Sequence, residues 1–310
     1  MELVKINNFF IKLLISALIL FPFPALCAEN ESGAISIYFS ENGELNCYLK
    51  GYCDYFPYGF KISPDGSLYL ANTLKNEILQ FDFMGRLSKS YKKDVVMPGD
   101  IAFDSEGMIY YANLNDMKVA KLDMLGNAVL AFGGYGTGDS ELMSIARIFV
   151  APGKKLFVQD FLQSKINVYN ESGNFIRKID CNVEGFFVNV RGELLCFSYD
   201  YENGYVLNLF DPNAKNKTCI FKAGLNEISD LKFVGVDFND NIYVSYCRKN
   251  APEVCEILMF GYNGAVLKTL KLKKSPFKVQ FFIFGDGSIY SADIEYDNVK
   301  KPSKIAIKKY

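Results

Sequence analysis

The chain has 310 residues, half of them hydrophobic and 15% aromatic, and its formal net charge is −1. This composition supplies a large apolar core, which excludes intrinsic disorder, and the balanced charge excludes the overall basic field that holds nucleic acid. The sequence contains no histidine, so catalytic sites and metal sites that need an imidazole are excluded as well.

The beginning of the chain, residues 1–28, has the pattern of a secretory signal peptide. Lys5 and Lys12 accompany an apolar run over residues 13–23, which ends in small residues. The run is shorter than the roughly 20 apolar residues that cross a bilayer, and no later segment could cross one. We therefore predict a secreted, periplasmic or cell-surface protein with no transmembrane segment in its mature chain. Lipid attachment at Cys27 is the alternative to simple cleavage.

A recurring pattern then fills residues 34–310. Each copy has a short apolar strand, a turn rich in Asp, Gly and Asn, an aromatic strand, an alternating third strand and a more polar fourth strand. Such turns supply the positive-φ positions of tight hairpins. The spacing of roughly 40–48 residues suits four-stranded blades. The sequence thus predicts an all-β six-bladed β-propeller, with copies at residues 57–91, 98–132, 145–180, 183–222, 229–271 and 276–310, and further strands at 34–50.

The two ends of the chain are predicted to share one blade. The sixth copy stops after a strand at residues 303–310, while strands at 34–40 and 44–50 lack an inner pair. Closing the ring in this way leaves no open sheet edge. A split of three C-terminal strands and one N-terminal strand, or two and two, stays open, because residues 34–40 and 303–310 both alternate like a third strand.

The copies resemble the NHL repeat. The first copy has Leu68-Tyr-Leu-Ala-Asn72 followed by Ile78-Leu-Gln-Phe-Asp-Phe-Met-Gly85, and the second has Ile109-Tyr-Tyr-Ala-Asn113 in the same place. The resemblance covers nearly all of the mature chain and is weakest in the fourth copy. It implies a six-bladed propeller used as a binding platform, and it does not imply a reaction, since one fold hosts many functions.

Two sets of residues are predicted to surround one mouth of the central channel. The residues that end the second strands are Asn72, Asn113, Asp160, Ser198, Tyr246 and Asp293. The residues near the start of the first strands are Gly59, Asp100, Arg147, Gly185, Phe233 and Gln280. Asn and Asp in the first set could instead hold turns by accepting backbone N–H bonds. Arg147 could pair with Asp100 or hold an anionic group with two hydrogen bonds.

These sets predict a binding role on one propeller face, with a protein, peptide or glycan as ligand and neither catalysis nor a cofactor. The alternative is a calcium-dependent hydrolase or lactonase that uses Asp, Asn and Glu in the channel, because calcium takes oxygen ligands and needs no histidine. Lactonases of related six-bladed shape use such sets, although the resemblance does not extend beyond the blades. A structural spacer at the cell surface is a third reading.

The cysteines and one glycine-rich stretch give two further predictions. The disulfide candidates of an exported chain are Cys47 with Cys53 and Cys247 with Cys255, and the second pair brackets one predicted hairpin loop. The glycine-rich stretch at residues 132–140 is predicted to be a flexible loop between blades, because no helix follows it as a phosphate-binding loop would require.

Overall fold

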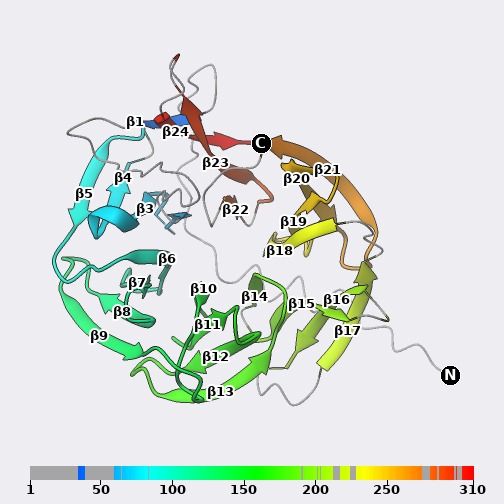
Figure 1. Cartoon of the computed structure of the whole chain (residues 1–310), viewed down its shortest axis with the longest axis horizontal. Coiled ribbons are helices and arrows are strands. Elements are labelled where there is room, and N and C mark those ends of the chain that lie inside the picture. Colours follow the sequence, from blue (N-terminus) through cyan, green and yellow to red (C-terminus); the bar gives the residue numbers. More distant parts are fainter. Residues whose placement is uncertain are drawn as a thin grey trace.

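The computed structural model describes residues 34–38, 59–63, 65–82, 84–189, 191–200, 202, 204–211, 217–223, 228–273, 280–284, 286–296, 298 and 302–310. Within these residues, 24 strands form six four-stranded antiparallel sheets around a common centre, and the predicted six-bladed β-propeller is confirmed (Figure 1). The predicted signal peptide, the predicted strand at residues 44–50, and Cys47 and Cys53 lie outside the described residues. No helix in the described part of the chain is long and apolar enough to span a bilayer.

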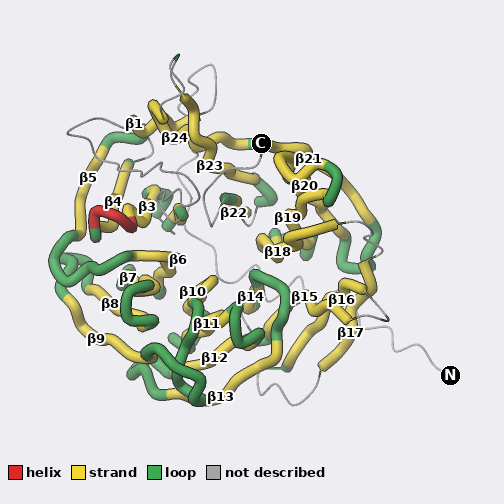
Figure 2. Tube along the Cα trace, in the orientation of Figure 1, coloured by secondary structure: helices red, strands yellow, loops and turns green. Residues whose placement is uncertain are grey.

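Each blade runs from an inner strand beside the channel to an outer strand at the rim. Blade 1 contains β2 (Phe60–Ile62), β3 (Leu68–Asn72), β4 (Glu77–Phe81) and β5 (Leu87–Tyr91). Blade 2 contains β6 (Pro98–Phe103), β7 (Ile109–Asn113), β8 (Lys118–Leu122) and β9 (Ala128–Gly133). Blade 3 contains β10 (Ile145–Val150), β11 (Leu156–Asp160), β12 (Lys165–Tyr169) and β13 (Phe175–Asp180). Blades 4 to 6 contain β14 (Phe186–Val188), β15 (Leu194–Asp200), β16 (Gly204–Phe210), β17 (Lys217–Ala223); β18 (Ile228–Val236), β19 (Ile242–Arg248), β20 (Ala251–Phe260), β21 (Val266–Lys273); and β22 (Phe281–Ile283), β23 (Ile289–Tyr296), β24 (Pro302–Lys309), β1 (Ala34–Tyr38). The single helical turn drawn in Figure 2 is η1 (Thr73–Lys75).

The sixth blade resolves the question of closure. Its strand order is β22, β23, β24 and then β1 at the rim. The register pairs Ala34 with Lys308 and Tyr38 with Lys304 in antiparallel fashion. The split is therefore three C-terminal strands and one N-terminal strand, and the two ends of the described chain meet in one sheet.

Side chains of Asp and Asn build the tight turns that the sequence pattern predicts. The Oδ1 atom of Asp82 accepts the N–H groups of Met84 and Arg86, both at 2.9 Å, and Gly85 adopts a φ of 77° between them. The same arrangement recurs at Asp123 in the next blade. A carboxylate that accepts two backbone N–H groups stabilises a tight turn at low cost, and glycine takes the left-handed position without strain.

The core is divided into six apolar clusters, each between two neighbouring blades, among the described residues. The cluster between blades 6 and 1 joins Phe60 and Leu70 to Tyr290 and Ile305, all buried. Every blade thus buries both of its faces against its neighbours, so that the ring closes through side-chain packing as well as through strand pairing.

Candidate functional site

The inner strands start at one face of the propeller, which we call the mouth face. It carries the connections between second and third strands and the connections from each blade to the next. At the start of the inner strands the register opposes Arg147 to Gln159 in blade 3 and Lys232 to Ser245 in blade 5. The placement of Phe233 at this position was wrong, because the register of β18 shifts at irregularities, and Phe233 itself is fully buried in the core.

Two cations and one carboxylate meet at the mouth from three neighbouring blades. Lys61 comes from β2, Asp100 from β6 and Arg147 from β10. Burial lowers the pKa of the Lys61 amine, the charge of Arg147 lowers it further, and Asp100 acts in the opposite direction. The charges of Asp100 and Arg147 thus act on the Lys61 amine in opposite directions. The Lys61 Nζ also lies 5.6 Å from the ring centroid of Phe282.

The carboxylate of Asp100 already accepts a backbone hydrogen bond. Asp100 is 2% exposed, and its Oδ2 accepts the N–H of Ile148 at 2.9 Å, which ties blade 2 to blade 3. Among the described residues, neither Lys61 nor Arg147 forms an ion pair within 4.0 Å, and the buried Nε of Arg147 has no hydrogen-bond partner. Asp100 and Arg147 are therefore neighbours that do not form the ion pair considered from the sequence.

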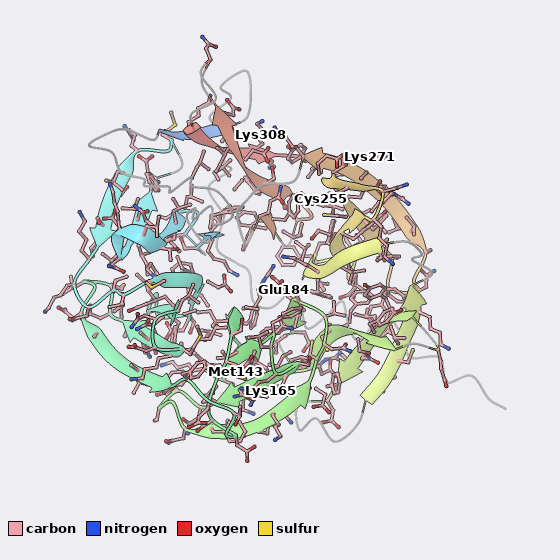
Figure 3. All side chains as sticks on the ribbon, in the orientation of Figure 1. Met143, Lys165, Glu184, Cys255, Lys271 and Lys308 are labelled. Carbon is pink, nitrogen blue, oxygen red and sulfur yellow. The ribbon has the colours of Figure 1, made fainter. Side chains whose placement is uncertain are left out.

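The next two blades add a second charged pair to the mouth. Lys232 Nζ lies 3.2 Å from Glu184 Oε2, and Glu184 is near the centre of the ring (Figure 3). The chain passes very closely here: the Phe233 N–H donates to the Glu184 carbonyl at 2.7 Å, and a Cβ on Gly185 would lie 2.0 Å from the Phe233 carbonyl oxygen. Glycine is required at residue 185 because only hydrogen fits.

The charged side chains described at the mouth therefore differ in whether they have an ion-pair partner. Lys232 has Glu184, whereas Lys61 and Arg147 face a carboxylate that is engaged elsewhere. Sequence reasoning found Asp100 and Arg147 but missed Lys61, Glu184 and Lys232. The signal for Lys61 was present, since a lysine interrupts an otherwise apolar inner strand.

Asn72 and Asn113, two of the predicted ligand residues, have partners within their own blades. The Asn72 Nδ2 donates to Glu77 Oε1 at 2.8 Å. The Asn113 Oδ1 accepts the N–H groups of Asn115 and Asp116 in the turn that follows β7. The Asn113 contacts match the turn-holding alternative described above, whereas the Asn72 amide instead binds a side chain on the next strand.

The two carboxylates of the same set differ in their surroundings. Asp160 is fully buried and accepts the N–H groups of Met143, at 2.6 Å, and Ser144, at 3.2 Å. Asp293 lies 3.7 Å from the Nζ of Lys308, and burial raises the pKa of Asp293. The partners of Asn113, Asp160 and Asp293 thus lie within their own blades. Within the described residues, no group of three or more Cys, Asp or Glu side chains could hold a metal ion.

The glycine-rich loop at residues 132–140 is fastened to blade 3. The Tyr169 hydroxyl donates to the Ser140 carbonyl at 2.9 Å, and the Asn167 amide donates to the Asp139 carbonyl at 3.1 Å. These contacts counter the mobility expected from its glycine content, because the loop is bound along its length by buried polar side chains. It connects β9 to β10 on the mouth face.

Cys247 and Cys255 face each other across β19 and β20. The register pairs them directly, and their Sγ atoms are 3.0 Å apart in a buried position. Adjacent strand positions with facing side chains allow a disulfide with little backbone movement. This pair lies near the end of the β19–β20 hairpin, beyond which the strands reach Arg248 and Ala251.

We expect an oxidised preparation of the mature protein to contain the Cys247–Cys255 disulfide. The loop it closes is short, so its reduction or a Cys247→Ser, Cys255→Ser double substitution should lower the free energy of unfolding by about 2 kcal/mol. Peptide mapping under non-reducing conditions and thermal unfolding measure both effects. Recovery of only unlinked Cys247 and Cys255 peptides from oxidised protein would contradict the assignment.

Similar folds occur in solved structures with low sequence identity. A catalytically inactive histidine-to-alanine variant of virginiamycin B lyase from Staphylococcus aureus with quinupristin has a TM-score of 0.54 and 13% identity, covering 91% of this chain and 97% of that chain. A gluconolactonase from Xanthomonas campestris has a TM-score of 0.55 and 11% identity, covering 79% and 82%. Hydrazine synthase from Kuenenia stuttgartiensis has a TM-score of 0.53 and 15% identity, covering 82% and 80%.

Identities this low show a shared propeller fold and no more, because this fold hosts many activities. No protein-family model and no curated protein matches the chain. Membership of the NHL-repeat family therefore stays an expectation from the sequence.

Proposed function

We propose that the chain is an exported binding module that holds an acidic group of a protein, peptide or glycan ligand at the mouth of its central channel. The observation that carries the proposal is the pair of cations Lys61 and Arg147, which have no carboxylate of their own among the described residues. Burying an unpaired charge costs free energy, which an arriving anion would offset. Arginine suits this role because its guanidinium binds carboxylates through two parallel hydrogen bonds.

A binding role fits the available chemistry better than the activity of the lyase among the structural neighbours. One neighbour is described as inactive when a histidine is replaced by alanine, and this chain has no histidine. The activity of that lyase therefore cannot be carried over residue by residue. The calcium-dependent alternative is not favoured by a specific observation, since Asn113 and Asp160 accept backbone N–H groups and Asp293 lies 3.7 Å from the Lys308 amine.

Citrate, a small tricarboxylate, tests the anion site without knowledge of the natural ligand. We expect calorimetric titration to detect citrate binding to the mature protein, and Arg147→Met or Lys61→Met to weaken it at least tenfold, since each removes a charged partner. Arg191→Gln is the matched control, because Arg191 pairs with Glu193 on the opposite face. Equal citrate affinity in the wild type and in both mouth variants would place any acidic ligand elsewhere.

Two further measurements distinguish a ligand site from a structural pair. Because Arg147 carries an unpaired buried group, Arg147→Met should raise the unfolding temperature of the unliganded protein by about 2 °C while it abolishes citrate binding. Because the pKa of Lys61 is lowered, its amine loses its proton below the ordinary lysine range. Citrate affinity should therefore fall as the pH rises through that lowered pKa, and Lys61→Met should remove this dependence.

A further inference from the structure

Large apolar side chains are exposed on the mouth face of blades 3 and 4. Tyr135 lies in the loop between β9 and β10, Phe161 and Leu162 follow β11, and Tyr199 lies near the end of β15. Leu162 is 65% exposed and Tyr135 is 70% exposed. The direction of these strands brings all four residues to the mouth face, and we call them the apolar shelf. Apolar side chains gathered at one face typically mark a place where a partner binds.

Hydrogen bonds join the segments that carry the shelf. The Gln163 amide donates to the Gly136 carbonyl at 2.9 Å, which connects the turn after β11 to the loop before β10. The Cys181 N–H donates to the Ser164 carbonyl at 2.8 Å. The next residue, Asn182, then donates to and accepts from the main chain of the shelf tyrosine in blade 4, both at 3.0 Å. The shelf is therefore one connected and pre-formed surface, so binding to it would need little ordering.

The shelf begins close to the cation pair. Arg147 is opposite Gln159 in the register, and Phe161 follows two residues later. The Phe161 N–H donates to the Ser144 carbonyl at 3.0 Å, three residues before Arg147. Two residues of an extended strand span about 7 Å, and the Arg147 side chain adds its own length, so a carboxylate on Arg147 would lie about three extended residues from the shelf.

The polar side chains beneath the shelf favour apolar peptide groups over sugars. The amides of Gln163 and Asn182 are used to bind the protein's own backbone. A sugar needs several free donors and acceptors for its hydroxyls as well as aromatic rings. The shelf offers the hydroxyls of Tyr135 and Tyr199, whereas Leu162 and Phe161 present only apolar surface. Apolar peptide side chains need no such partners.

We propose that the ligand is a peptide whose carboxylate enters the Lys61–Arg147 site and whose apolar side chains, about three residues away, pack on the apolar shelf. The inference rests on the proposed anion site and adds the class of partner and the direction in which it lies. The carboxylate is either the α-carboxylate of a chain end or the side chain of Asp or Glu. The two sources share the same chemistry at Arg147.

Short fluorescein-labelled peptides test this by fluorescence anisotropy. The reference peptide carries a Leu-Phe pair three residues before a free carboxyl terminus. A second peptide has Ser-Ser in place of Leu-Phe, a third is amidated at its end, and a fourth is amidated but ends in Asp. The protein variants are Leu162→Ser and Tyr135→Ser on the shelf. Leu125→Ser is the matched control, since Leu125 is 78% exposed in the turn between β8 and β9 on the other face.

We expect the reference peptide to bind, and the Ser-Ser peptide and each shelf variant to lose about tenfold in affinity. Leu125→Ser should change nothing. The amidated peptide should bind weakly. If the amidated peptide that ends in Asp regains the affinity of the reference peptide, a side-chain carboxylate is sufficient for binding. If the protein binds citrate but has equal affinity for the Leu-Phe and Ser-Ser peptides, the peptide inference is wrong while the anion site stands. The same follows if an oligogalacturonate binds more tightly than any peptide. Loss of citrate binding as well would remove the proposed function itself.

Discussion

Replacing Asp160 with alanine is expected to lower the free energy of unfolding by about 3 kcal/mol and the unfolding temperature by about 8 °C. Its carboxylate is fully buried and accepts four hydrogen bonds. The donors are the N–H groups of Met143 and Ser144 before β10 and two groups of Gln163 after β11. Alanine would remove the acceptor of three backbone N–H groups, which costs more than the hydrogen bonds themselves contribute, while the Gln163 side-chain amide would keep the Gly136 carbonyl.

The matched control is Asp180→Ala, at an exposed position that ends β13. That change should stay within about 0.5 kcal/mol of the wild type, as surface substitutions usually do. The stability of Asp160→Asn should lie between those of the two alanine variants, because the Asn oxygen still accepts hydrogen bonds while its NH₂ group faces donors. Chemical denaturation curves provide the comparison. Equal stability of the two alanine variants would show that the carboxylate does not hold these segments.

The Asp160→Ala variant also distinguishes between two possible roles of Asp160. As a ligand residue it would be needed for binding, whereas as a turn-holding residue it would be needed for stability. Its acceptor positions face the backbone of its own blade, so folded Asp160→Ala protein should keep the citrate affinity of the wild type. Measuring binding and stability on one preparation decides between the two.

The blades could be predicted from the sequence because their turns are local. The Asp82 carboxylate accepts N–H groups within the next four residues, and Gly85, with its positive φ, lies between these two donors. Closure could not be predicted fully, because the alternation of Ile35 and Ile37 resembles that of Ile305 and Ile307. Which strand takes the rim depends on pairing between chain ends, which a local pattern does not contain.

The candidate site was predictable only in part, for a related reason. Arg147 stands out as a cation at the start of an inner strand. Its lack of a carboxylate partner depends on Asp100 accepting the N–H of Ile148 from the neighbouring blade. The assignment of Phe233 failed because irregularities in β18 shift the register, and a bulge leaves little trace in the spacing of apolar residues. A contact between blades decided the first outcome, and an irregular strand within one blade decided the second.

Removing β1 is expected to have the second large effect. In a chain that starts at residue 39, β24 loses the five residue pairs that join it to Ala34–Tyr38. The loss of this backbone pairing should cost on the order of 4 kcal/mol, and the bare edge of β24 would invite pairing between molecules. A chain that starts at residue 34 is the control. We expect the shorter chain to unfold more than about 10 °C lower and to elute partly as oligomers.

Moving β1 to the other end of the chain tests whether pairing, and not chain length, is responsible. The register opposes Ala34 to Lys308 at the end of β24, so a short glycine-containing turn after Tyr310 followed by the sequence of residues 34–38 would form a hairpin with β24. This rearranged chain, starting at residue 39, should regain the unfolding temperature and the monomeric elution of the control. If the truncated chain were as stable as the control, or if the relocated strand restored nothing, β1 would not be what closes the ring. Blade 6 would then have to be held by packing against its two neighbours, including the cluster around Phe60 and Ile305.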